Sequence, residues 1–213
     1  MRTRLIAAGI AALALSAGSA HASSVVDPVG DFLPSFVGTH DADLDVTSFS
    51  VVYDADLARF LLSATLAGPI DPSKPGLYVI GVNTGTGLVA PFGGIGEPNV
   101  IFNQAIVVQK SGAAAVSGTS LSATISGNMF SVIAPLSALP STGFKPTQYG
   151  FNLWPRNGLG NNNQISDFAP QNATLSAPEP STWAMLVAGF GLLGGVLRRS
   201  RRAMSPAGIS ARA

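Results

Sequence analysis

Cysteine is absent from this 213-residue chain, which also has only two histidines, 11% charged residues and 8% aromatic residues. Without cysteine no disulfide can cross-link the fold, so stability has to come from a hydrophobic core, a bound ion or a surrounding matrix. The same shortage removes the commonest nucleophile–base pairs of hydrolytic enzymes. The composition therefore predicts a protein that is not an enzyme.

Basic charge is scarce in the long middle section, residues 23–177. This section has ten acidic and five basic side chains, a net charge of −5, and most arginines lie outside it. Nucleic-acid binding needs a basic surface, so we expect no nucleic-acid partner. The section is long enough for one domain with its own core.

Long amphipathic helical patterns are also missing from the middle section, and short strand-like runs separated by Gly, Pro, Asn and Asp take their place. The predicted strands are Asp45–Tyr53, Arg59–Ala67, Leu77–Asn83, Val100–Gln109, Ala113–Ser117, Leu121–Ser126, Met129–Ala134, Tyr149–Trp154 and Ala173–Ser176. In the first run, alternation places Thr47, Phe49 and Val51 on one face. We predict an all-β fold, a single antiparallel β-sandwich or jelly-roll-like domain.

The first 22 residues have the pattern of a signal peptide. Its parts are Arg2, Arg4, the apolar run Leu5–Leu15 and the small-residue site Ala20-His21-Ala22. This order is typical of a secretory signal peptide cleaved after Ala22, with Ala20 and Ala22 as the recognised small residues. It predicts Sec-type export machinery and signal peptidase as partners.

The C-terminal region combines prolines, an apolar segment and a basic cluster. The parts are Pro178-Glu179-Pro180, the apolar span 183–197 beginning at Trp183, and Arg198, Arg199, Arg201 and Arg202. A 15-residue helix is about 22 Å long, less than the roughly 30 Å of a hydrocarbon core, which suits a transient transmembrane anchor. Because arginine accumulates on the cytoplasmic side, residues before Pro178 would lie outside the cytoplasm and residues 203–213 would form a short cytoplasmic tail.

These residues, 178–202, resemble the PEP-CTERM sorting signal of exported proteins in Gram-negative bacteria that make exopolysaccharide. The resemblance implies a partner, the exosortase, which is a membrane protease thought to cut near the Pro-Glu-Pro triplet. It also implies anchoring in the inner membrane before processing and a final place on the outer surface or in the extracellular matrix. Proline interrupts a helix, so the backbone at Pro178 and Pro180 should be extended and open to a protease.

An aspartate-rich segment offers candidate metal ligands. Asp41, Asp43 and Asp45 alternate along the chain, and Asp27 and Asp31 precede them. Carboxylate oxygens are ligands that Ca²⁺ prefers, but the glycine and glutamate of an EF-hand loop are missing, so a site built from two loops is the form to expect. The alternative is that these aspartates only begin a strand and keep a sheet edge soluble.

The segments at Asp27–Phe32 and 42–47 also resemble DOMON-like and family-9-type carbohydrate-binding sandwiches, which implies a sugar ligand. Candidate sugar-contacting residues are Tyr149, Asn152, Trp154, Asn161, Asn162 and Asn163. Aromatic rings stack on sugars and amides bond to hydroxyls. The alternative is that the aromatic residues pack in the core and the asparagines form a solvated turn.

Three functions stay open from the sequence. The first is an exported, exopolysaccharide-associated protein that binds carbohydrate, and the second is a purely structural or adhesive surface protein. The third is a glycoside hydrolase using paired carboxylates, for which the candidates are Asp41, Asp43, Asp54, Asp56 and Glu97. Calcium is the one cofactor that the sequence suggests.

Overall fold

The computed structural model describes residues 21–177. Within that range no helix is long and apolar enough to cross a membrane. The predicted apolar span 183–197 lies outside it. So do most of the signal peptide with Ala20, and the sorting residues Pro178, Glu179, Pro180, Trp183, Arg198, Arg199, Arg201 and Arg202.

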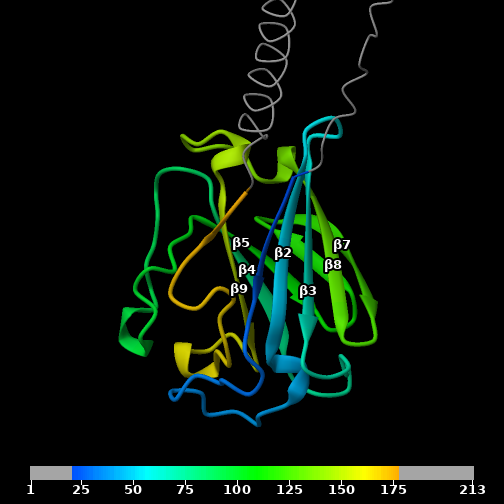
Figure 1. The fold of residues 1–213 in the computed structure, drawn as a ribbon, viewed down its shortest axis with the longest axis vertical. Coiled ribbons are helices and arrows are strands. Elements are labelled where there is room, and N and C mark those ends of the chain that lie inside the picture. The colour runs from blue at the N-terminus through cyan, green and yellow to red at the C-terminus, as the bar shows by residue number, and fades with distance from the viewer. Residues whose placement is uncertain (1–20, 178–213) are drawn as a thin grey trace, which may run out of the picture.

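Ten antiparallel strands form one sheet in the described part of the chain (Figure 1). They are β1 (His21–Val26), β2 (Val46–Asp54), β3 (Arg59–Leu66), β4 (Leu77–Asn83), β5 (Gln104–Gln109), β6 (Ala113–Val116), β7 (Thr119–Ser126), β8 (Met129–Pro135), β9 (Gly150–Arg156) and β10 (Leu175–Ser176). The spatial order is β1-β2-β3-β8-β7-β6-β5-β4-β9-β10. The all-β prediction is confirmed.

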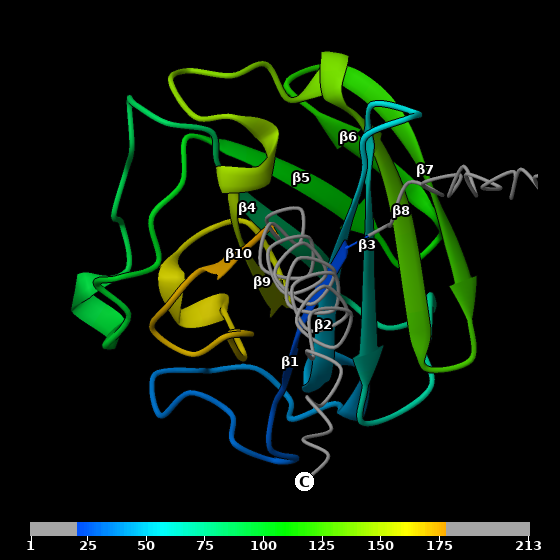
Figure 2. The same ribbon diagram turned by 45° about the horizontal axis from the view of Figure 1, so that its top comes forward.

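The sheet folds over on itself into two layers around one core. Strands β1, β2, β3, β8 and β7 make one layer, and β5, β4, β9 and β10 make the other, with β6 joining β7 to β5. Side chains from both layers meet inside, as shown by the ring centroids of Phe60 and Phe151 at 5.1 Å and of Tyr78 and Phe130 at 4.7 Å. The end strands β1 and β10 lie close together, so the sheet is nearly closed (Figure 2).

Strand β1 was not among the predicted strands, because residues 21 and 22 were assigned to the signal peptide. Ala22 pairs with Val52 of β2, and Ser24 with Ser50. Cleavage after Ala22 would shorten β1 to Ser23–Val26 and leave four of its six residue pairs in place. The predicted cleavage point is therefore compatible with the fold.

A β-bulge corrects the predicted face of β2. Val46 pairs with Leu66 and Ser48 pairs with Thr65, which leaves Thr47 as the extra residue. On the N-terminal side of the bulge, the positions that face the core and the positions that face solvent are exchanged. Val46, rather than Thr47, is therefore fully buried in the core beside Phe49.

A second hydrophobic cluster covers the outer face of β4 and β9, so both strands are buried along their whole length. Its buried members are Leu33, Phe36, Leu44, Leu77, Val79, Phe92, Val100, Trp154, Ile165 and Phe168. They come from the strands and from the loops before β2, between β4 and β5, and after β9. This double burial explains the unbroken apolar run from Leu77 to Ile80.

Candidate metal centre

Three carboxylates from distant parts of the chain meet at one end of the sheet. Asp27 directly follows β1, Asp31 lies in the loop that leads to β2, and Asp167 lies between β9 and β10. One carboxylate oxygen from each of the three lies within 4.8 Å of the other two. We call this group the carboxylate cluster.

Backbone hydrogen bonds hold the three segments together. The Asp27 amide donates to the carbonyl of Thr47 at 3.0 Å, and the Leu33 amide donates to the carbonyl of Ser166 at 2.8 Å. The hydroxyl of Ser166 donates to the carbonyl of Leu44 at 2.7 Å. Hydrogen bonds between these segments therefore fix the backbone around the cluster.

The Asp167 carboxylate is itself fixed by two amides. Its Oδ2 accepts from the Val46 amide at 2.8 Å, and its Oδ1 accepts from the Phe168 amide at 2.6 Å. Asp167 is buried, and so is Asp27. A neighbouring carboxylate, Asp45, is also buried and accepts from the Gly30 amide through Oδ2 at 2.8 Å.

Burial and mutual repulsion change the acidity of this region. Burial, followed by the charges of Asp31 and Asp45, raises the pKa of Asp27 to about 7. Burial also raises the pKa of Asp167 to about 8, with further increases from Asp27 and Asp31 and opposition from the two amides. The pKa of Asp45 is raised by burial and by Asp31. The group does not easily hold all its negative charges without a counter-charge, since two like charges 4 Å apart repel by about 4 kcal/mol near a protein surface.

Several oxygen atoms in this region are buried without a hydrogen-bond partner. They are Oδ2 of Asp27, Oδ1 of Asp31 and Oδ1 of Asp45. Among residues 21–177 there are three ion pairs, and none includes a member of the cluster or Asp45. Buried carboxylate oxygens normally have a donor or a cation.

The donor set defines which ion would fit. All the ligand atoms are carboxylate oxygens, and hard cations such as Ca²⁺ prefer oxygen at about 2.3–2.6 Å. Two ligands of one such ion can lie at most about 5 Å apart. The three oxygens within 4.8 Å meet this limit.

The structure does not bring the predicted metal ligands Asp41, Asp43 and Asp45 together. The Asp41 carboxylate pairs with Lys74 at 2.6 Å, while the Asp43 carboxylate pairs with Lys110 at 2.7 Å. Ala42–Leu44 forms a 3₁₀ turn, which sends alternate side chains in different directions. Asp45 is the one member of that trio that lies near the carboxylate cluster.

Asp167 was missed because it stands alone in the last part of the domain sequence. It has no acidic neighbour, and the spacing between it and Asp27 carries no signal. Asp27 and Asp31 stood out in the sequence only as acidic residues that precede Asp41, Asp43 and Asp45. Only the pairing of β9 with β4, and the packing of the segment after β9 against the start of β2, brings Asp167 to them.

The side chains of Tyr149, Asn152 and Trp154, which the sequence suggests as sugar-contacting residues, are all buried. The Tyr149 hydroxyl donates to the carbonyl of Leu139 at 3.1 Å. The Asn152 amide donates to the carbonyls of Pro170 and Ala173 at 2.6 and 2.8 Å. Trp154 packs against Phe92 and Phe102, so the core-packing alternative fits these residues.

The predicted asparagines lie in a surface turn. Asn161 is exposed and its Oδ1 accepts from the Asn163 amide at 2.9 Å, which caps the short 3₁₀ helix Asn162–Gln164. The Asn162 side chain donates to the carbonyl of Pro91 at 2.8 Å. The Asn161 side chain therefore caps its own turn, and the Asn162 side chain joins that turn to the loop at Pro91.

The candidate hydrolase carboxylates are spread over the domain. Asp43 precedes β2 and Asp54 ends it, so the nine residues of β2 separate them, about 30 Å at 3.4 Å per residue. Asp54 pairs with Arg59 at 3.3 Å, and the buried Glu97 accepts from the Asn172 amide. Glycosidase pairs need a separation of about 5–9.5 Å, which Asp43 and Asp54 do not have.

The end of β10 marks where the fold meets the C-terminal region. Leu175 pairs with Phe151 and Ser176 with Gly150, and the Ala177 amide donates to the carbonyl of Tyr149 at 2.7 Å. Tyr149 stacks on Phe60, which contacts Tyr53 near the start of β1. The two ends of the described chain therefore leave from the same end of the sheet, and the carboxylate cluster follows the other end of β1.

A family model described as the PEP-CTERM protein-sorting motif matches residues 176–202. Neither the curated proteins nor the solved structures contain a match to this chain. The motif makes this an exported protein that an exosortase processes after transient anchoring in the membrane.

Proposed function

Because the chain carries a PEP-CTERM sorting motif, we propose that it is a non-enzymatic protein of the cell surface or extracellular matrix and that it associates with exopolysaccharide. Its binding surface is the outer face of the layer β1-β2-β3-β8-β7. The observation that carries the proposal is a row of small hydroxyl side chains across all five strands of this layer.

The row is set by the strand register. Its members are Ser24, Ser50, Ser63, Ser131 and Thr124, each paired with the next. Neighbouring strands lie about 4.8 Å apart, so the hydroxyls are spaced regularly across the sheet. We call this surface the hydroxyl face.

One adjoining row on the same face is apolar, and the other is mixed. One adjoining row contains Val52, Leu61 and Ile133, and the other contains Ser48, Thr65 and Met129. Leu61, Ile133 and Met129 are 38%, 45% and 47% exposed. No charged side chain occurs in these three rows, and the ion pair of Asp54 and Arg59 lies one row beyond.

This chemistry matches a neutral sugar polymer better than a charged partner. Hydroxyl groups can donate to and accept from sugar hydroxyls, and the aliphatic side chains can cover the apolar faces of sugar rings. An uncharged sheet surface suits an extended chain, whereas a small ligand needs a concave pocket to bury most of its surface. The buried positions of Tyr149 and Trp154 are consistent with a face that works without aromatic stacking.

A structural or adhesive role is the second candidate, supported by the exposed apolar residues of the same face. Contiguous apolar surface also favours contact between two copies of a protein. In that case the hydroxyl face would join copies within the matrix.

Binding of the purified protein to the exopolysaccharide of its own host separates these functions. Saturable binding is expected, and the substitution Ser63→Arg at the centre of the face should weaken it by about tenfold or more, because it inserts a long charged side chain. Ser137→Arg is the matched control, since Ser137 is exposed on a 3₁₀ turn outside the face and should bind normally.

Two results would contradict the proposal: absence of saturable binding by the natural sequence, or equal loss in both variants. Light scattering of the same samples tests self-association. If Ser63→Arg abolishes self-association and the natural protein does not bind the polymer, the structural candidate replaces the proposal.

A further inference from the structure

We propose that the carboxylate cluster of Asp27, Asp31 and Asp167, with Asp45 beside it, is a calcium site. The ion would fasten the segments next to the edge strands β1 and β10 to the rest of the sheet. The proposal is independent of what the hydroxyl face binds. It concerns an ion that the fold itself would hold.

The geometry of the three side chains favours a shared ion. The three oxygens converge within 4.8 Å, although Asp27 and Asp167 are 140 residues apart in sequence. Two of the three segments are loops whose backbone is already hydrogen bonded, through Leu33 and Ser166. The backbone that carries Asp31 and Asp167 is therefore held in place without the ion, which reduces the entropy lost on binding.

Two buried carboxylates of this region have oxygen atoms without hydrogen-bond partners. Asp27 is only 8% exposed and its Oδ2 has no hydrogen-bond partner, and Asp45 is 3% exposed with an unpartnered Oδ1. Buried carboxylate oxygens without donors are costly, and a divalent cation would satisfy them together. The basic side chains that form ion pairs in the described chain, Arg59, Lys74 and Lys110, pair elsewhere.

The chemistry of the ligand atoms favours calcium. The cluster offers only oxygen, and neither cysteine nor histidine is among its members, which favours a hard cation over zinc or copper. The protein is exported. Calcium sites of extracellular modules commonly have dissociation constants of about 10⁻⁴–10⁻³ M.

The ion would link the two edge segments of the sheet. Asp27 ends the edge strand β1, and Asp167 belongs to the segment that leads into the edge strand β10. An ion shared by Asp27, Asp31 and Asp167 would hold these edge segments against β2. A chain without disulfides would gain a cross-link of this kind only from a metal.

Calorimetric titration of the purified full chain with CaCl₂, after treatment with EDTA, tests the site. We expect one ion per chain with a dissociation constant of about 10⁻⁴–10⁻³ M. The melting temperature should rise by roughly 5–10 °C at about 100 times that concentration. Absence of both binding heat and a shift would overturn the proposal.

The variant Asp31→Asn makes the test specific. Without calcium its melting temperature should equal or exceed that of the natural sequence, because one repelling charge is gone. With calcium it should be lower, because a ligand is gone. This reversal cannot result from simple misfolding.

Asp41→Asn is the matched control, since Asp41 belongs to the aspartate-rich segment but pairs with Lys74. It should keep the full calcium response. Calcium responses of equal size in Asp31→Asn and the natural sequence would overturn the proposed site. Loss of the response in Asp41→Asn alone would also overturn it, because the ligand would then be Asp41.

Discussion

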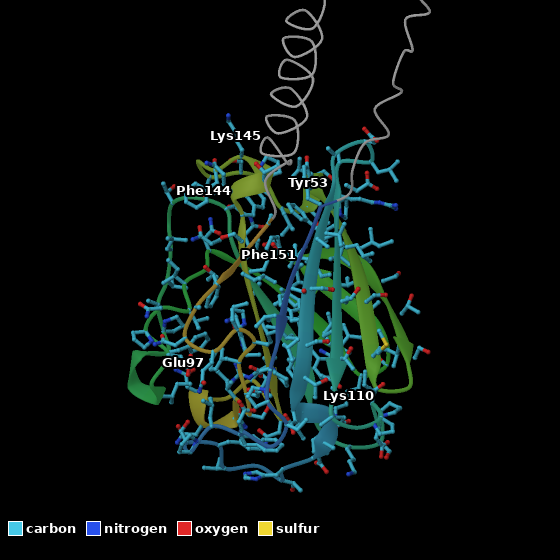
Figure 3. The ribbon with its side chains drawn as sticks, viewed as in Figure 1. Tyr53, Glu97, Lys110, Phe144, Lys145 and Phe151 are labelled. Atoms are coloured by element: carbon cyan, nitrogen blue, oxygen red, sulfur yellow. The ribbon has the colours of Figure 1, made fainter. Side chains whose placement is uncertain are left out.

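The carboxylate of Asp43 and the ammonium group of Lys110 lie 2.7 Å apart, and each side chain is only 3% exposed. Asp43 stands in the 3₁₀ turn before β2. Lys110, which is labelled in Figure 3, follows the end of β5. The Lys110 ammonium also donates to the carbonyl of Pro75 at 3.1 Å, and Asp43 accepts from the Asp71 amide at 3.0 Å. This buried pair therefore joins the two layers and the loop between β3 and β4.

Replacing Lys110 by Met should lower the free energy of unfolding by about 3–5 kcal/mol, because a buried carboxylate then loses its counter-charge. Urea denaturation measures the change. The double variant Asp43→Asn/Lys110→Met should lose less than the sum of the two single variants, because no unpaired charge is left. The exposed pair of Lys74 and Asp41 provides the control, and Lys74→Met should change the free energy of unfolding far less, because water screens exposed charges. Equal losses at Lys74 and Lys110 would contradict this account.

Trp154→Ala should destabilise the domain by about 3–5 kcal/mol, because its ring fills the cluster outside β4 and β9 beside Phe92 and Phe168. Trp154→Phe should cost less, because it keeps part of the packing and removes a buried indole N–H that has no partner. Thermal unfolding and polymer binding should be measured on the same samples. Loss of binding by a still-folded Trp154→Phe variant would restore the sugar-stacking interpretation of Trp154.

Gly81→Ala should also destabilise the protein, by about 1–3 kcal/mol. Gly81 lies in β4 opposite Asn152 of β9, and a β-carbon there would lie 2.5 Å from Cζ3 of Trp154. The smaller ring of Trp154→Phe should relieve the clash, so the double variant should be more stable than the two separate losses predict. Additive losses in chemical denaturation would show that Gly81 is needed for another reason.

Intact-mass analysis of the protein from an exosortase-positive host should give a chain that begins at Ser23 and ends near Pro178–Pro180. The amide of Ala177 is the last described group bonded to the sheet, so a cut just beyond it leaves every described strand pair of β10 intact. The same gene in a host without exosortase should keep the C-terminal residues. Recovery of the uncut chain from the exosortase-positive host would contradict the processing.

Local patterns in the sequence were sufficient to predict most strands. The bounds of Leu77–Asn83 agree with β4, and those of Met129–Ala134 differ from β8 by one residue. Both runs alternate or are continuously apolar between turn residues, a signal that depends only on nearby residues. The β-bulge at Val46 and Ser48 breaks that signal, because one extra residue exchanges the two faces of the strand.

The sequence by itself determined the class of fold and the sorting motif, because strand periodicity and a short linear motif are both written in neighbouring residues. Which side chains meet was decided only by the tertiary structure. Asp27 and Asp167 meet because the segment after β9 packs against the start of β2, where β1 ends. Trp154 is covered because loops fold over the outer face of β9. Such encounters depend on the order of strands in the sheet, and spacing along the chain does not encode them.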